Sequence, residues 1–214
     1  MRRLLLPLLF SLFACALPAA AQEYHDIDVD LPAYPEMQPV EDLPVYYAPG
    51  VESNYFFYDG LYWDFYGDAW YSSPWYNGPW SLVDPVYVPT YLLWVPVRYY
   101  HRPPAYFRGW ARDRAPRWGV HWGPRWQEAH NRVYTGPRTA VQRAPLPQYQ
   151  RQFTRENYPR APQEQTQLHS RQYNYRPQER VGQQQYQQRG IAQPQAQPHA
   201  GGQAHHGGEE HRGR

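Results

Sequence analysis

The sequence contains almost no cysteine and no lysine. Its single cysteine, Cys15, lies inside an N-terminal apolar run, so the rest of the chain has no disulfide and no thiolate for catalysis or metal binding. All the residues counted as Lys or Arg are arginines. A Gly-x-Ser-x-Gly nucleophile elbow and a glycine-rich phosphate loop are also absent. These absences remove the usual motifs of serine hydrolases and nucleotide-binding enzymes.

Residues 1–21 have the composition of a secretory signal peptide. Two arginines precede a leucine-rich apolar run, and Ala19 and Ala21 are the small residues that a signal peptidase needs before its cleavage site. We therefore predict export to the periplasm, the outer membrane or the medium. The alternative is a lipoprotein signal in which Cys15 carries a lipid anchor, although Phe13 fits that motif poorly. No later stretch is apolar and long enough to predict a transmembrane span.

Charge is divided unevenly along the chain. Residues 22–97 contain 12 acidic residues and no arginine, a net charge of −12. From Arg98 onward there are 19 arginines and 7 acidic residues, a net charge of +12. Such an asymmetry predicts either docking of one half on the other or association with a charged surface.

Composition divides the chain into four parts. After the signal peptide, residues 22–44 are acidic and proline-rich, which predicts an extended, mostly unpaired arm. Residues 45–132 are rich in aromatic residues and are expected to form a β-rich module. Residues 133–214 are rich in Gln, Arg, Pro and His and poor in apolar residues. We expect a disordered basic tail there, because such a segment buries too little surface to offset its ordering entropy.

Two tight turns give the clearest structural signal. Asp59-Gly60 is typical of a type I′ hairpin turn, and Gly67-Asp68 fits a type II′ turn with glycine first. The fold class is therefore mainly β, a small antiparallel three-stranded meander. The predicted pairs are Tyr58–Leu61, Phe57–Tyr62, Phe56–Trp63 and Tyr55–Asp64 across the first turn, and Tyr66–Ala69, Phe65–Trp70 and Asp64–Tyr71 across the second.

Alternation along these strands gives the sheet two unlike faces. One face is apolar and is expected to form the core, with Phe56, Tyr58, Leu61, Trp63, Phe65 and Trp70. The other is rich in tyrosine, whose ring is apolar and whose hydroxyl is polar. We expect the following segment to cover it, because aromatic patches are usually buried. Alternatively this face binds a flat ligand such as a sugar ring, through Tyr55, Tyr62, Tyr66, Tyr71, Trp75 and Trp80.

The next segment, up to residue 132, should wrap over the sheet. Closely spaced prolines exclude long helices and central strands, so Pro85–Val88 and Val95–Tyr99 are expected to be short edge strands or wrapping segments. One helical turn is expected at Pro89–Leu93 and a short helix at Pro124–His130.

Further along this segment, arginines alternate with tryptophans. Three tryptophans, at 118, 122 and 126, repeat every four residues like one face of a helix. Gly119 and Gly123 argue against a helix, so an irregular wrap that stacks Trp and Arg over the sheet is expected.

The aromatic part of the chain resembles a known type of protein. The residues concerned are Tyr47-x-Pro49-Gly50, Tyr62-Trp63 with Gly67 and Trp70, Trp75-Tyr76-Asn77-Gly78-Pro79-Trp80, and His121-Trp122-Gly123-x-x-Trp126. They are similar to exported bacterial envelope proteins with YXWGXW-type repeats, over about residues 45–126. The resemblance implies an exported β-rich envelope module and supplies no catalytic residues.

We therefore expect a non-enzymatic, exported structural or interaction protein of the cell envelope. Its basic tail would contact acidic envelope polymers or envelope proteins, because arginine binds carboxylates and phosphates bidentately. No catalytic residue, metal site or cofactor is predicted, and export argues against a nucleic-acid partner despite the basic and aromatic composition. The alternative is a glycan-binding module that uses the tyrosine face. A hydrolase built on His and Asp has the least support.

Overall fold

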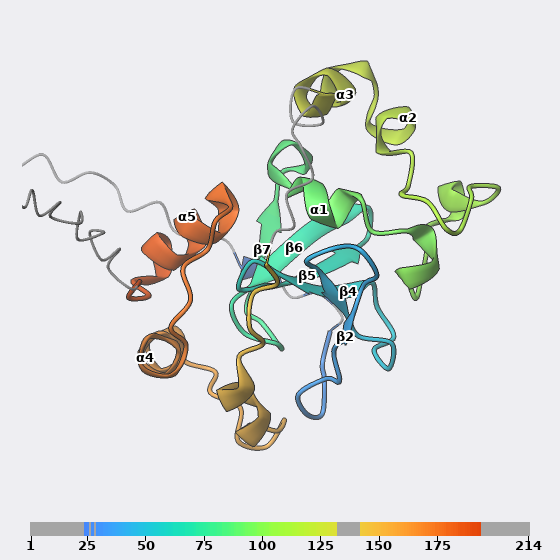
Figure 1. Cartoon of the computed structure of the whole chain (residues 1–214). Coiled ribbons are helices and arrows are strands. Elements are labelled where there is room, and N and C mark those ends of the chain that lie inside the picture. Colours follow the sequence, from blue (N-terminus) through green and yellow to red (C-terminus); the bar gives the residue numbers. More distant parts are fainter. Residues whose placement is uncertain (1–23, 26, 28, 132–141, 194–214) are drawn as a thin grey trace, which may run out of the picture.

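The structure, a computed structural model, describes residues 24–25, 27, 29–131 and 142–193 (Figure 1). At its centre is a seven-stranded antiparallel sheet in the order β1-β7-β6-β5-β4-β3-β2. Strands β2 to β6 each pair with the next strand along the chain, and β7 also pairs with β1. The strands are β1 (Tyr24–His25), β2 (Gln38–Pro39), β3 (Tyr46–Tyr47), β4 (Tyr55–Tyr58), β5 (Leu61–Tyr66), β6 (Ala69–Ser73) and β7 (Trp80–Val83).

The predicted meander is confirmed at residue level, as strands β4, β5 and β6. Every pair predicted across the two turns occurs in the structure. Asp59 and Gly60 both have positive φ, as a type I′ turn requires. The type II′ prediction for the second turn is wrong, because Gly67 has φ 57° and Asp68 has φ 67°, again the type I′ pattern. Aspartate tolerates the left-handed region better than most residues, so it can occupy either central position.

The segment after the sheet wraps over it, as expected, but it covers the apolar face and not the tyrosine face that it was expected to cover. It packs on the apolar face and forms one core with Phe56, Trp63, Phe65 and Trp70. The helical turn at 89–93 and the helix that begins at Pro124 are confirmed. Of the two alternatives for 85–88 and 95–99, edge strands are wrong and wrapping segments are confirmed, since both stretches contain short 3₁₀ turns and pack on the sheet. The elements are η1 (Pro85–Tyr87), α1 (Thr90–Leu93), η2 (Val97–Tyr99), η3 (Ala105–Phe107), α2 (Trp118–Trp122) and α3 (Pro124–Asn131).

The irregular wrap predicted around the repeated tryptophans is wrong. The rings of Trp118 and Trp122 stack within α2, 4.6 Å apart and 12° from parallel, and Trp122 contacts Trp126 of α3 at 4.9 Å. Gly123, with φ 85°, follows α2 as its C-terminal cap, and α3 begins at the next residue. The spacing of four residues was therefore a helix face, divided between two short helices.

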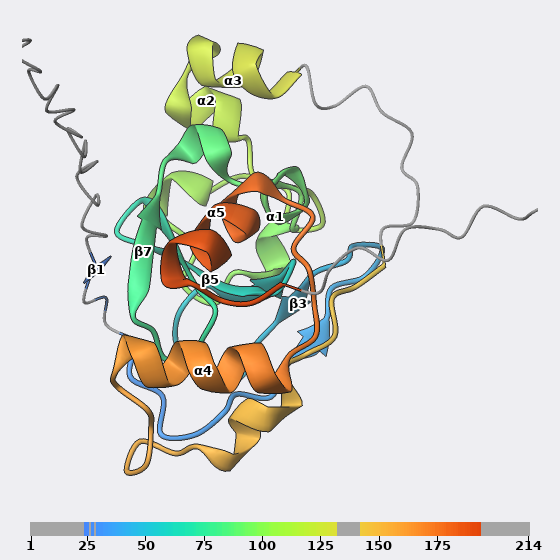
Figure 2. The ribbon, with the colours of Figure 1, turned by 90° about the vertical axis from the view of Figure 1, so that its left-hand side faces the viewer.

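The other face of the sheet is covered by a part of the chain that was expected to be disordered. That prediction is wrong for residues 142–193, and residues 133–141 and 194–214 lie outside the described part. Residues 144–175 join a second core with Tyr55, Phe57 and Tyr62, and α5 extends the first core (Figure 2). The elements here are η4 (Gln148–Gln152), α4 (Pro162–Gln172) and α5 (Arg180–Arg189).

The acidic arm also takes part in the fold. Ile27 and Val29 are buried in the second core, and the backbone N–H of Leu31 donates to Asn77 Oδ1 at 2.9 Å. Strand β2, within the arm, forms the edge of the sheet beside β3. The expectation of a mostly unpaired arm is therefore wrong for its described residues.

Hydrogen bonds explain how a polar C-terminal segment becomes ordered. The side chain of Gln150 accepts from the Tyr76 backbone N–H at 3.1 Å and donates to Pro74 O at 2.9 Å. The carboxylate of Asp59 accepts from the backbone N–H groups of Gln178 and Glu179, at 2.8 and 2.7 Å. A buried glutamine and a turn aspartate thus attach this segment in addition to its apolar contacts, and their bonds offset the cost of burying polar groups.

We predict that Tyr186→Ala destabilises the protein by about 3–5 kcal/mol, as loss of a buried aromatic ring usually does. Tyr186 is 0% exposed, donates to Gly60 O at 3.3 Å and bonds His169 Nε2 at 2.9 Å. Urea unfolding of residues 22–214 measures the change. Tyr87→Ala, at a position that is 54% exposed, is the control and should cost little. Equal, small effects of both substitutions would contradict an ordered C-terminal segment.

Candidate functional site

The six aromatic residues proposed to bind a ligand do not form an open face. Tyr55, Tyr62, Trp75 and Trp80 are buried, Tyr71 is half-buried, and only Tyr66 is exposed. A flat ligand therefore has no stacking platform there, and this site prediction is corrected. The simpler expectation, a covered tyrosine face, holds, but the cover comes from the C-terminal segment and the N-terminal arm rather than from the following segment.

Aromatic residues of the covering segments pack directly against the rings that were proposed to bind a ligand. Tyr34 meets Tyr62 edge to face at 6.3 Å, and their hydroxyls are 3.2 Å apart. Trp75 makes edge-to-face contacts with Tyr149 at 5.6 Å and Tyr158 at 5.8 Å. Aromatic pairs of this geometry stabilise a core by more than their buried area alone. The tyrosine face is an interior surface of the fold.

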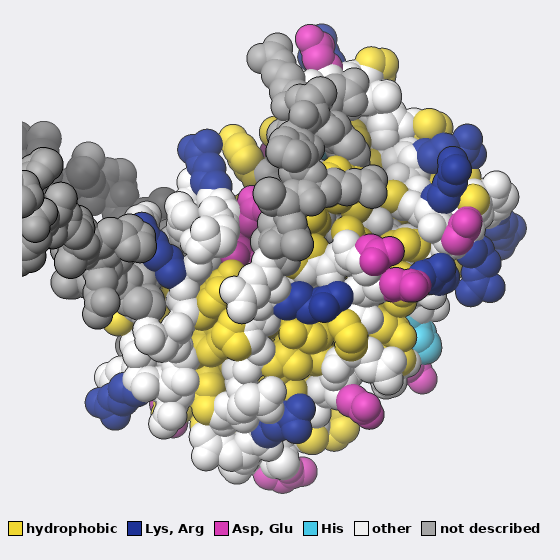
Figure 3. Space-filling model, viewed as in Figure 1, with side chains coloured by type: hydrophobic (Ala, Val, Ile, Leu, Met, Phe, Trp, Pro, Cys, Tyr) yellow, Lys and Arg dark blue, Asp and Glu magenta, His cyan; other side chains and the backbone are white. Residues whose placement is uncertain are grey.

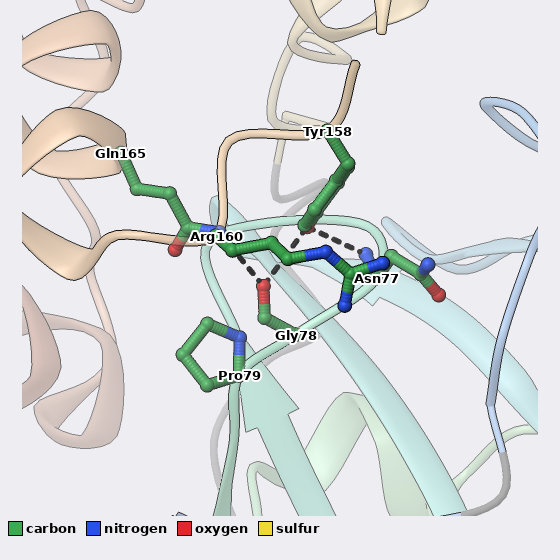
Figure 4. Close-up of a pocket in the computed structure, with 6 residues that line it drawn as sticks. All are labelled: Asn77, Gly78, Pro79, Tyr158, Arg160 and Gln165. Carbon is green, nitrogen blue, oxygen red and sulfur yellow. Dashed lines mark hydrogen bonds between the residues drawn. The ribbon is translucent and has the colours of Figure 1, made fainter. Parts of the chain in front are cut away.

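A small pocket lies where the β6–β7 connection meets the segment before α4 (Figure 4). Its volume is about 180 Å³, and Arg160 and Pro79 are among the residues that line it. The carbonyl of Gly78 accepts from the Tyr158 hydroxyl at 2.9 Å and from Gln165 Nε2 at 3.1 Å. The Gly78 carbonyl is thus bonded by two donors that join distant segments, and we assign no ligand to the pocket.

Some of the opposite charges of the two halves form ion pairs within the molecule. Arg98 pairs with Glu41 at 2.8 Å, Arg102 with Glu52 at 2.5 Å, and Arg155 with Asp30 at 3.1 Å. In each pair the acid comes from the N-terminal half and the arginine from the C-terminal half. Docking of one half on the other, one of the two alternatives that the charge pattern left open, therefore occurs.

A second group of arginines has no such partner. They lie between the end of η3 and the first turn of α3, and all are exposed. None forms an ion pair with the residues that the structure describes. The guanidinium of Arg117 lies over the ring of Trp110, at 5.3 Å. Asp113 and Glu128 are the acidic residues of this stretch, so it is positive overall, and arginines gather at the upper right of Figure 3. We call this group the arginine surface: Arg108, Arg112, Arg114, Arg117 and Arg125.

A polar clasp holds α2 beside the arginine surface. His121 Nε2 lies 2.8 Å from both carboxylate oxygens of Asp68, and the Tyr106 hydroxyl donates to Asp68 Oδ1 at 2.7 Å. The rings of Tyr106 and His121 stack 3.8 Å apart. Asp68 belongs to the β5–β6 turn, so the clasp ties the sheet to α2. The sequence contains these residues, but their separation in the chain gave no signal that they meet.

Asp64 and His169 are two of the buried titratable groups of the described residues. Asp64 in β5 is fully buried, accepts from the Ser53 hydroxyl at 2.5 Å, and has a pKa that burial raises to about 7. His169 in α4 is bonded on both ring nitrogens, to the hydroxyls of Tyr149 and Tyr186. Burial lowers the pKa of His169 to about 3, so its ring is neutral at ordinary pH. Both groups belong to the packing of the fold.

Within residues 24–131 and 142–193, apart from the undescribed 26 and 28, no group of three or more His, Cys, Asp or Glu side chains is placed to hold a metal. The helices of this described part are all too short or too polar to cross a bilayer. Comparisons with models of protein families, with curated proteins and with solved structures found no match.

We predict that Asp64→Asn changes how stability depends on pH. The folded-state pKa of about 7 lies above the ordinary value of 3.8, so the wild-type carboxyl stabilises the fold fully below about pH 4. That contribution is lost as the pH rises to about 7, and it amounts to on the order of 4 kcal/mol. The advantage of the variant over the wild type in free energy of unfolding should therefore grow over this range.

Urea unfolding of both proteins at a series of pH values measures this difference. Comparing variant with wild type isolates Asp64, because His169 has the opposite pH dependence and is present in both. Asp113→Asn, at an exposed carboxylate, is the matched control. A difference that stays constant with pH would show that Asp64 is ionised in the folded protein.

Proposed function

We propose that this chain is a non-enzymatic, exported interaction protein of the cell envelope, which contacts an acidic envelope partner through its arginine surface. The observation that carries the proposal is the set of five exposed arginines without ion pairs among the described residues. An unpaired guanidinium can bind carboxylate or phosphate bidentately, and it is more weakly hydrated than an ammonium.

Rigid support strengthens this proposal. Arg117 rests on Trp110, and the segment that carries Arg112 and Arg114 is held by hydrogen bonds to η2, from Arg98 N to Arg112 O at 2.8 Å and from Val97 N to Arg114 O at 3.0 Å. Charges fixed on a folded support lose less conformational entropy on binding than charges on a flexible tail. We therefore assign the contact with the acidic partner to the arginine surface. The C-terminal tail, which was expected to make this contact, packs in large part against the sheet.

Export and the envelope location are part of the proposal. The apolar N-terminal run and the resemblance to exported envelope proteins support them, and anionic lipids, acidic polysaccharides and acidic proteins are all partners with suitable charge. A non-enzymatic role is supported by the way the ionisable groups of the interior are used. His169, Asp59 and Asp64 each bond neighbouring groups of the fold, and we assign none of them to a reaction.

We predict that serine at Arg108, Arg112 and Arg114 together weakens binding to an acidic partner by about 100-fold, at about 1 kcal/mol per arginine. The probes are vesicles containing phosphatidylglycerol and a soluble acidic polysaccharide, mixed with residues 22–214 at low and high salt. Added salt should weaken wild-type binding, because exposed charges are screened.

The matched control carries serine at Arg160, Arg171 and Arg176, three exposed arginines on or next to α4 and before α5. It removes the same charge and should keep most of the binding. Equal losses in both triple variants would mean that only net charge matters, and binding that ignores salt would contradict the proposal.

A further inference from the structure

Helices α2 and α3 form a projecting end of the molecule. Both ribbon views place them beyond the sheet, at the opposite end from α4 (Figures 1 and 2). Their contact with the rest of the chain includes a hydrogen bond from Trp126 Nε1 to Pro85 O of η1, at 3.0 Å. We call this end the tip and define it by Arg117, Val120, Trp122 and Arg125.

Apolar side chains are exposed at and around this tip. Val120, in the middle of α2, is 72% exposed, more than any other large hydrophobic residue that the structure describes. Val86 and Tyr87, which are also exposed, belong to η1, on which α3 packs. The exposed Tyr66 immediately precedes the turn whose Asp68 binds His121 of α2. Exposed apolar residues that gather on adjoining elements mark an interaction surface more often than scattered ones do.

Val120 is exposed because neighbouring residues of α2 hold the helix in a fixed orientation. Trp118, two residues earlier, is buried and donates from Nε1 to Leu93 O at 3.1 Å, and Trp122 stacks on it. The clasp from His121 to Asp68 fixes the same helix from the side. With its neighbours on both sides held, Val120 cannot turn inward, and it stands between Arg117 and Arg125 in the chain.

We propose that the tip docks on an anionic phospholipid surface, with Val120 entering the boundary between head groups and acyl chains and Arg117 and Arg125 binding lipid phosphates. This inference rests on the proposed function and names lipid as the partner of the arginine surface. Charge complementarity would be met by any polyanion. An exposed valine among arginines gains free energy only where the partner also offers an apolar phase, and a lipid interface combines the two.

The test uses residues 22–214, which include every residue that the structure describes, with vesicles of phosphatidylcholine alone or mixed with phosphatidylglycerol. Val120→Asp should weaken binding to the mixed vesicles about tenfold or more, since it removes the partial burial of a valine. Serine at both Arg117 and Arg125 should weaken it roughly 30-fold. Serine at both Arg160 and Arg171, near the opposite end, is the charge-matched control. Unfolding midpoints confirm that each variant is folded.

A second readout separates lipid from other polyanions. The tested chain begins after Cys15, so Val120→Cys introduces a single thiol that can carry an environment-sensitive dye. A blue shift with mixed vesicles and none with a soluble acidic polysaccharide supports the inference. If the polysaccharide binds and Val120→Asp does not change vesicle binding, the lipid inference fails while the proposed function stands. If neither vesicles nor polysaccharide bind, both fail.

Discussion

The structure depends on one constraint: its central sheet is apolar on both faces. Strands β4 and β5 alternate Phe56 and Trp63 on one side with Phe57 and Tyr62 on the other, and all four are fully buried. A small sheet of this kind is stable only when something covers it. The chain therefore needs two separate covers, and no single neighbouring segment can supply both. This need explains why the sheet is covered by segments that are distant in the sequence, namely the described parts of 24–40, 85–131 and 142–193.

The two covers use different chemistry. The first contains tryptophans and prolines and packs mainly by shape, with Trp118 against Phe65 and Trp70. The second is rich in Gln and Tyr and is attached by directed hydrogen bonds, as Gln150 and Gln165 show with the backbone of the β6–β7 connection. Hydrogen bonds from a buried side chain such as Gln150 to backbone atoms at fixed positions make the docked position of this cover specific.

This difference explains how much of the fold could be predicted from the sequence. The hairpin register was predictable because Asp59-Gly60 and Gly67-Asp68 are local signals beside strict alternation. The C-terminal cover was not, since its order depends on partners more than 70 residues away, such as Asp59 for Gln178. The same holds for the aromatic residues proposed as a ligand site. Their chemistry suits sugar rings or protein rings equally, and only the position of Tyr149 and Tyr158 decides between them.

The arginines also differ in the groups that their side chains contact. In the C-terminal cover, Arg151 lies over Tyr34, Arg155 pairs with Asp30, and Arg143 donates to Val40 O, so these guanidinium groups fasten the cover to the acidic arm. Among the described residues, the arginine surface pairs with no carboxylate of the arm. Docking within the chain thus accounts for part of the charge asymmetry. Exposed arginines also remain near α4, at Arg160, Arg171 and Arg176, but the denser group is the arginine surface, with five between Arg108 and Arg125. Positive charge concentrated in this way attracts an external anion more strongly than the same number of charges spread evenly.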